Sequence, residues 1–104
     1  MPDRAELRLA HLEAAHTRLR PTLIDLQCRG AHGEIEDPSL LPELLRRDAR
    51  MTELMRELRL RISERPGLSA WVELDRAWSS LRLATLRLLD RARTTAPAPA
   101  RLSA

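Results

Sequence analysis

The sequence has no phenylalanine, no tyrosine and no lysine, and it contains only two tryptophans, Trp71 and Trp78. β-Branched and aromatic residues, which strands favour, are scarce throughout the chain, so a sheet is not expected. Leu, Ala, Arg and Glu dominate instead, and all four are good helix formers. The composition therefore predicts an all-α fold.

Cysteines and long apolar runs are also lacking. Cys28 is the only cysteine, which excludes an intramolecular disulfide and suits a reducing compartment. No apolar run approaches the roughly 20 residues that a membrane-spanning helix needs. The N-terminus, Met1-Pro2-Asp3, leads into a charged amphipathic stretch and not into a signal peptide. We therefore expect a cytoplasmic protein without a membrane partner.

The 104 residues fit one domain. In residues 1–94, apolar residues recur at spacings of three and four in three separate segments, which is typical of helices that share a core. Residues 95–104 include Ala-Pro-Ala-Pro-Ala and have no apolar period. We expect a helical bundle over residues 1–94 and a disordered tail over residues 95–104.

The first helix is predicted over residues 3–29. Asp3 is placed to cap its start, and Gly30 is a natural C-terminal stop. Pro21 falls on the outward side of the apolar seam. Because proline removes one backbone hydrogen bond, we expect it to kink this helix or split it in two.

Residues 30–38 hold two glycines, an acidic cluster and Asp37-Pro38, and they are predicted to form a linker. The second helix should begin near Ser39, as a capping residue, and end at the break formed by residues 65–67 (Arg-Pro-Gly). The third helix should run from Leu68 or Ser69 to Arg93.

Short connections favour antiparallel neighbours, so the predicted architecture is an up-down-up three-helix bundle. The apolar seams of the three helices supply the expected core. Its principal members are Leu12, Leu19, Leu26, Met51, Met55, Leu58, Trp71, Trp78 and Leu81.

Two polar residues occupy seam positions. His16 is expected to pack its ring among leucine and methionine side chains. Asp48 is expected about one layer away from it, so a pair between His16 and Asp48 is possible but not favoured. His11 and His16 are five residues apart, whereas the zinc-hydrolase motif needs a spacing of four to put both rings on one helix face.

Neither a metal site nor a catalytic site is indicated. Cys28 and His32 are not part of two CxxC- or HxxxH-type pairs, and Cys28 is expected to be partly buried on its helix. There is no glycine-rich phosphate loop, and no serine has a supporting base in the sequence pattern. The carboxylates alternate with arginines at helical spacing, as in Glu43 and Arg47. We expect neither enzymatic activity nor a cofactor.

Several apolar residues lie outside the seams. They are Leu7, Leu60, Val72, Leu83 and Leu86. A helix that is apolar on two sides usually buries its second face against another chain, although a wider core is an alternative. The predicted partner interface consists of Val72, Leu83, Leu86 and Leu60, with Arg82 and Arg87 at its rim.

Charge is unevenly distributed. From Arg76 onward the chain has six arginines and one acid, Asp90, whereas residues 30–43 hold four acids and no arginine. An arginine-rich helix could contact phosphates through Arg82, Arg87, Arg91 and Arg93, so nucleic acid is an alternative partner. The proposed topology also places the acidic linker (Glu34, Glu36 and Asp37) near Arg87, Arg91 and Arg93, where the charges would partly neutralise each other.

Residues 42–54, Pro-Glu-Leu-Leu-Arg-Arg-Asp-Ala-Arg-Met-Thr-Glu-Leu, resemble the middle helix of small flagellar export chaperones. The two tryptophans have no counterpart in that likeness, which assigns no family. The sequence favours a small, homodimeric, bacterial-type adaptor or export-chaperone-like protein that binds an amphipathic helix. The alternatives are a nucleic-acid-associated regulator and a structural subunit of a larger assembly.

Overall fold

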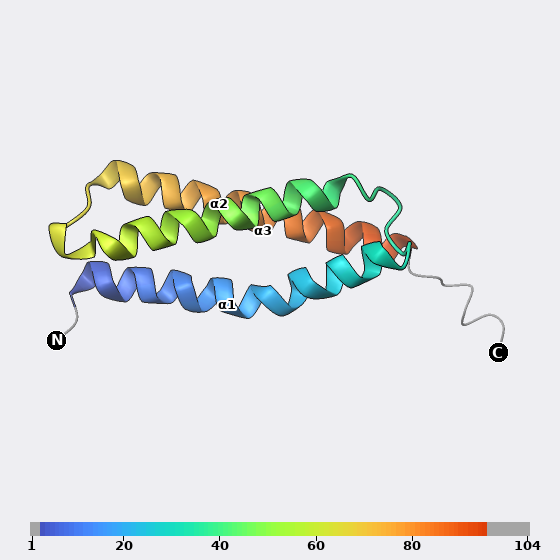
Figure 1. Cartoon of the computed structure of the whole chain (residues 1–104), viewed down its shortest axis with the longest axis horizontal. Helices are drawn as coiled ribbons and strands as arrows, with labels where there is room; N and C mark the ends of the chain where they lie inside the picture. The colour runs from blue at the N-terminus through green and yellow to red at the C-terminus, as the bar shows by residue number, and fades with distance from the viewer. Residues whose placement is uncertain (1–2, 96–104) are drawn as a thin grey trace.

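The computed structural model describes residues 3–95, which form three long helices and a short 3₁₀ turn. The elements are α1 (Arg4–Ala31), α2 (Leu40–Leu60), η1 (Ile62–Glu64) and α3 (Leu68–Thr95). The helices run antiparallel in chain order, and each contacts the other two (Figure 1). The predicted all-α three-helix bundle is confirmed. Residues 96–104 of the predicted tail lie outside the described residues, and Thr95 is the last residue of α3.

The start and the middle of α1 follow from Asp3 and Pro21. The carboxylate of Asp3 accepts a hydrogen bond of 3.1 Å from the backbone N–H of Ala5, which confirms the predicted cap. Pro21 is exposed and lies inside α1, which continues past it. Figure 1 shows a gentle bend near the middle of this helix. The proline therefore bends α1 and does not split it.

The end of α1 corrects the role predicted for Gly30. The helix continues to Ala31, and Gly33, with a φ of 71°, takes the left-handed conformation after it. A methyl group at position 30 would overlap with Cδ1 of Leu41. Gly30 thus permits a close approach between α1 and the start of α2, and the predicted helix stop at this residue is wrong.

The ends of α2 differ from the prediction in two respects. Ser39 precedes the helix as expected, but its side chain makes no capping bond. Instead its N–H and Oγ–H groups donate to Oδ1 of Asp37, at 3.2 and 2.5 Å. The α-helix ends at Leu60, well before the predicted break at residues 65–67. The segment between them contains η1, and Arg65, which follows η1, has a left-handed φ of 53°.

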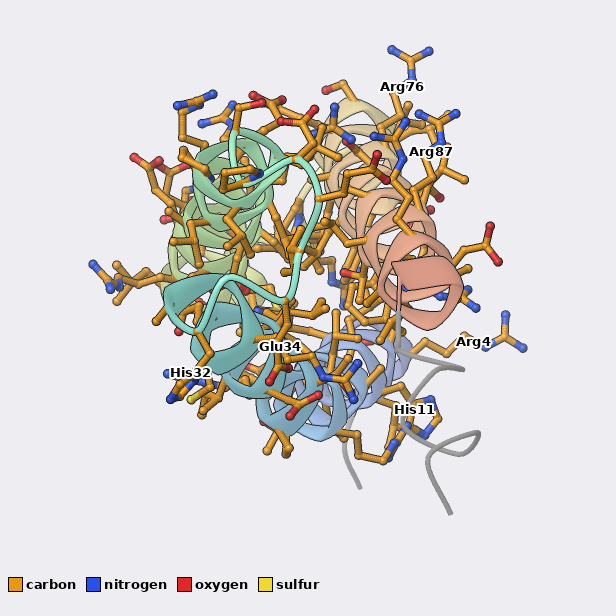
Figure 2. The ribbon with its side chains drawn as sticks, turned by 90° about the vertical axis from the view of Figure 1, so that its right-hand side faces the viewer. Arg4, His11, His32, Glu34, Arg76 and Arg87 are labelled. Atoms are coloured by element: carbon orange, nitrogen blue, oxygen red, sulfur yellow. The ribbon has the colours of Figure 1, made fainter. Side chains whose placement is uncertain are left out.

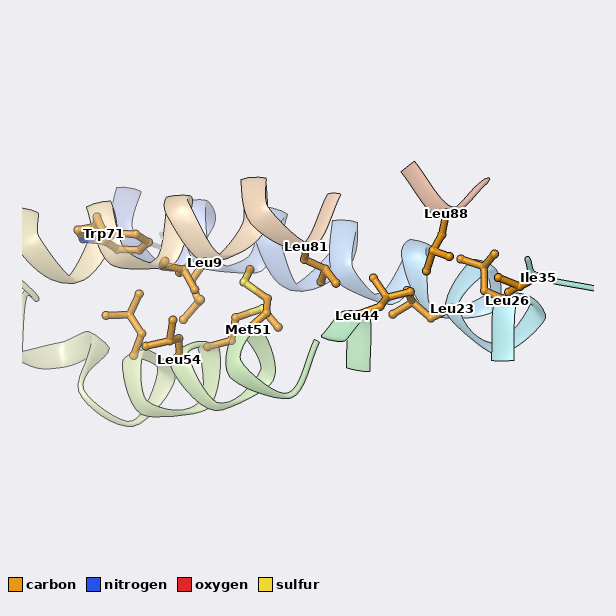
Figure 3. Packing of buried hydrophobic residues seen from close by; sticks show 13 residues of the cluster. Leu9, Leu23, Leu26, Ile35, Leu44, Met51, Leu54, Trp71, Leu81 and Leu88 are labelled. Atoms are coloured by element: carbon orange, nitrogen blue, oxygen red, sulfur yellow. The ribbon is translucent and has the colours of Figure 1, made fainter. Parts of the chain in front are cut away.

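The predicted core residues all lie in or against the observed core, whose buried residues are drawn in Figure 3. Six of them are buried: Leu26, Met51, Met55, Leu58, Trp71 and Leu81. The other three, Leu12, Leu19 and Trp78, are partly buried and pack against the cluster. Two buried members of the core lie outside the predicted seams. Leu54 lies beside the α2 seam, and Ile35 comes from the linker and packs at the end of the bundle near Leu26 (Figure 3).

Polar contacts at one end of the bundle join α1 to the other two helices. Arg8 pairs with Asp75 of α3 at 2.6 Å, and its guanidinium lies 4.5 Å from the ring centroid of Trp71. Arg59 of α2 pairs with Glu13 of α1, and this contact raises the pKa of the Arg59 guanidinium. Because both ion pairs are exposed, they help to orient α1 but contribute little to the stability of the fold.

Candidate protein-binding surface

The third helix carries two stripes of residues on opposite sides. The inner stripe supplies Trp71, Leu74, Leu81 and Leu88 to the core. The second stripe also has spacings of four and three, and we call it the outer stripe. It consists of Val72, Arg76, Ser79, Leu83, Leu86 and Asp90. Alternating spacings of this kind keep residues on one helix face, and this face turns away from the core.

The three apolar members of the outer stripe are exposed. Leu83 has 49% of its surface exposed and Leu86 57%, whereas Leu81, two residues before Leu83, is fully buried. Val72 is also exposed. The alternative of a wider core that covers these positions is therefore wrong for Leu83 and Leu86, since neither α1 nor α2 buries them.

A groove lies between α2 and α3, beside the outer stripe. Its volume is about 340 Å³, and its lining includes Leu40, Ala84 and Leu88 as an apolar part. Arg47, Arg87 and Arg91 lie at its edges, together with Glu43 and Asp90. Asp90 belongs to the outer stripe and Arg87 lies one helical turn after Leu83, and both line the groove, so the groove borders the outer stripe.

Pairing within α2 sets the electrostatics on one side of this groove. Glu43 accepts hydrogen bonds from Arg46 at 2.7 Å and from Arg47 at 3.0 Å. These donors lower the pKa of the Glu43 carboxyl. The Nη1 group of Arg47 also donates to the backbone carbonyl of Ser80 at 3.2 Å, which fixes α2 against α3 at this level.

Two predicted interface arginines border the outer stripe. The guanidinium of Arg82 lies 6.0 Å from the ring centroid of Trp78, on the side of α3 that faces α1. Arg87 lies on the other side of the stripe and lines the groove. Figure 2 shows Arg87 and Arg76 projecting from α3 away from α1.

Leu60 does not belong to this surface, although it was predicted as part of the interface. It is 76% exposed at the end of α2, where the chain turns toward α3. Leu83 lies fifteen residues beyond the start of α3 at Leu68, about 22 Å along the helix axis. The structure therefore brings Leu83, Leu86, Arg82 and Arg87 together beyond the middle of α3 and leaves Leu60 at the end of the bundle where α3 begins.

His16 and Asp48 pair, contrary to the sequence prediction. His16 is buried as expected, and its Nε2–H group donates to Oδ1 of Asp48 at 2.5 Å. Its ring also meets Trp78 edge-on, with centroids 6.5 Å apart. The pair lies between α1 and α2, so we interpret it as a contact that joins helices and not as a reactive centre.

The acidic linker meets the end of α3 through Asp37. Its carboxylate lies 4.0 Å from the guanidinium of Arg91. The hydrogen bond from the Ser39 hydroxyl lowers the pKa of Asp37, and the charge of Arg91 adds to the effect. The predicted proximity of acidic linker and basic end is thus observed for this pair, while the side chain of Arg93 lies outside the described residues.

The remaining candidates do not form a site. Cys28 is exposed, so its predicted partial burial is wrong. Across residues 3–95, no three side chains of His, Cys, Asp or Glu gather closely enough to hold a metal ion. In that same part of the chain, no helix has the length and apolar character needed to cross a membrane.

Comparison with protein-family models, with curated proteins and with solved structures found no match for this chain.

Proposed function

We propose that this protein is a helical adaptor that binds another protein through the outer stripe of α3. The exposure of Leu83 and Leu86 carries the proposal. Single exposed leucines are common on protein surfaces and need no explanation. Two leucines three residues apart, on the outer side of a helix whose inner side is in the core, are typical of a helix that binds a partner.

In this proposal the partner is an amphipathic helix. Its apolar residues would pack against Leu83 and Leu86 and extend into the adjoining groove over Ala84 and Leu88. Arg82 and Arg87 lie at the rim, where charges affect specificity and the rate of association more than affinity. Val72 would extend the contact toward the start of α3.

The alternatives use different residues. A nucleic acid would contact the arginines and leave the leucines of the outer stripe exposed. A second copy of this chain, as in the expected homodimer, would cover the leucines of both copies at once. A structural subunit would bind stably within a larger assembly through the same face. Variants of the leucines and of the arginines therefore separate the nucleic acid from the protein partners.

Affinity capture from the native host, with quantitative mass spectrometry, tests the proposal. The informative variant is Leu83→Ser/Leu86→Ser, and the matched control is Leu7→Ser, because Leu7 is 45% exposed on a different helix. We expect one protein to be retained by the wild type and by Leu7→Ser, to be lost from the double variant, and to rebind when purified. The proposal fails if every captured protein binds the double variant as well as it binds the wild type.

A further inference from the structure

Three arginines on or beside the outer stripe have no acidic partner among the residues that the structure describes. Arg76, Arg82 and Arg87 form neither an ion pair nor a side-chain hydrogen bond anywhere in residues 3–95, and Arg82 contacts only the ring of Trp78. All three are exposed. Arg82 and Arg87 thus flank Leu83 and Leu86, and Arg76 lies about two helical turns before Leu83 on the same stripe.

The carboxylates of α3, by contrast, are already engaged. Glu73 accepts a hydrogen bond from Arg50 of α2 at 2.5 Å, and Asp75 accepts one from Arg8 of α1 at 2.6 Å. Asp90 also has a contact and is not free. Arginines of α2 and α1 therefore neutralise Glu73 and Asp75, whereas Arg76, Arg82 and Arg87 of α3 keep their positive charge.

From this asymmetry we infer that the segment bound by the outer stripe is an acidic amphipathic helix, with Asp or Glu on both sides of its apolar residues. The inference rests on the proposed function and adds the charge of the partner. The alternating spacing of the stripe matches a helix, since heptad positions pack against heptad positions. Carboxylates beside the partner's apolar residues would reach Arg82 on one side and Arg87 on the other, where bidentate pairs with arginine are favourable.

The same charges disfavour the other occupants. Two copies of α3 joined through the stripe would bring six arginines and only two acids, the two copies of Asp90, to one interface around four leucines, and this excess of like charge opposes association. A nucleic acid would neutralise the arginines but would leave Leu83 and Leu86 in water. Only an acidic and apolar segment satisfies both parts of the surface.

Two synthetic helical peptides test the inference with the full chain. Both carry leucine at heptad positions, and they differ only in having glutamate or lysine at the flanking positions. Fluorescence anisotropy with labelled peptides gives the two dissociation constants. We expect the glutamate peptide to bind at least about tenfold more tightly, which corresponds to about 1.4 kcal/mol. We also expect its affinity to fall as salt is raised.

Charge reversal provides the decisive comparison. In Arg82→Glu/Arg87→Glu, we expect the preference to invert in favour of the lysine peptide. The matched control is Arg18→Glu/Arg20→Glu, because both of these arginines are exposed on α1 and away from the stripe. This control should keep the wild-type preference. Circular dichroism verifies that each variant remains helical.

The outcomes separate the inference from the proposed function. Equal binding of both peptides through Leu83 and Leu86 would overturn the acidic partner and leave the adaptor proposal standing. Binding of the glutamate peptide that survives Leu83→Ser/Leu86→Ser would show a purely electrostatic contact and overturn the inference. Self-association that this leucine variant abolishes, or duplex DNA binding that needs Arg82 and Arg87 alone, would overturn it as well. If neither peptide binds, the inference fails, while host capture still tests the adaptor.

Discussion

His16 of α1 and Asp48 of α2 form a hydrogen bond of 2.5 Å at the edge of the hydrophobic core. The His16 side chain is 7% exposed and that of Asp48 is 25% exposed, so the histidine depends on this contact while the carboxylate still reaches water. The hydroxyl of Thr52, one turn further along α2, donates a hydrogen bond to the backbone carbonyl of Asp48. The pair therefore fixes the axial position of α1 against α2.

Removing the acceptor should destabilise the bundle. In Asp48→Ala the ring of His16 loses its partner inside the bundle, and an unsatisfied buried donor costs about 1–3 kcal/mol. We expect the free energy of unfolding, measured by urea denaturation, to fall by that amount. Asp48→Asn keeps an acceptor oxygen at the same place and should cost less.

The double variant His16→Leu/Asp48→Leu is the control for this pair. Replacing both polar partners with apolar groups leaves no donor unsatisfied, so its stability should be closer to the wild type than that of Asp48→Ala. If Asp48→Ala is as stable as the wild type, the hydrogen bond does not contribute to the fold.

A second prediction concerns Gly33, which has a φ of 71° directly after α1. Because a side chain disfavours this left-handed conformation, Gly33→Ala should lower the free energy of unfolding by about 1–2 kcal/mol. Nothing lies within 4 Å of a methyl group built at this position, so backbone strain would be the sole cause. Thermal denaturation measures the effect.

Gly67 provides the matched control for Gly33. A methyl group at position 67 likewise has nothing within 4 Å, but this glycine does not have a positive φ. Gly67→Ala should be neutral or stabilise the protein by about 0.4–1 kcal/mol, because alanine restricts the unfolded chain. Equal losses in the two variants would contradict the assignment of strain to Gly33.

A third prediction concerns acid. The folded chain lowers the pKa of Asp37, through Ser39, and that of Glu43, through Arg46 and Arg47. A lowered pKa means that each carboxyl adds stability above its unfolded pKa of about 4 and loses that stability as the pH falls through its folded value. The free energy of unfolding should therefore decrease below about pH 4.

The variant Asp37→Asn/Glu43→Gln isolates this contribution. It should be less stable than the wild type at neutral pH, and its stability should depend less on pH in the acidic range. Both carboxyls are solvent-accessible, so the difference is small and is best measured at low salt. Identical pH profiles for the variant and the wild type would show that other carboxyls cause the acid response.

The fold was predictable because apolar periodicity determines which residues share a helix face. The seams identified Leu26, Met51 and Leu81 as core, and all three are buried. The surface pair Leu83 and Leu86 followed from the same pattern, since residues outside a seam face away from it. Capping and helix-breaking residues likewise predicted the start of all three helices to within about one residue.

Contacts that depend on how the helices are placed relative to one another were not predictable. The pairing of His16 with Asp48 depends on the axial offset between α1 and α2, and no seam defines that offset. Leu54 is buried because α2 contacts both neighbours, so its buried arc is wider than one seam. Gly30 seemed to be a helix stop, because sequence alone does not show the approach of Leu41.

Ile35 gives the last prediction, because it is a linker residue with only 5% of its surface exposed. It packs at the end of the bundle beside Leu26, and its Cδ1 atom lies 3.8 Å from a methyl group built at Gly30 (Figure 3). Ile35→Ala should leave a cavity there and lower the free energy of unfolding by roughly 2–5 kcal/mol. Urea denaturation measures this loss, and a smaller value would mean that the linker relaxes into the space.

The matched control for Ile35 is Ile24→Ala, because Ile24 is 56% exposed on α1. Its stability should stay within about 0.5 kcal/mol of the wild type, as expected for a surface substitution.

The comparison of Ile35→Ala with Ile24→Ala also tests the acidic linker, because Ile35 lies two residues before Asp37 and holds that segment against the bundle. If Ile35→Ala frees the linker, the Asp37–Arg91 contact at 4.0 Å should weaken with it. The main cause of the lowered pKa of Asp37, the hydrogen bond from Ser39, lies within the linker itself, so NMR titration should show only a small rise in this pKa from the loss of the Arg91 charge, whereas Ile24→Ala should leave the pKa unchanged.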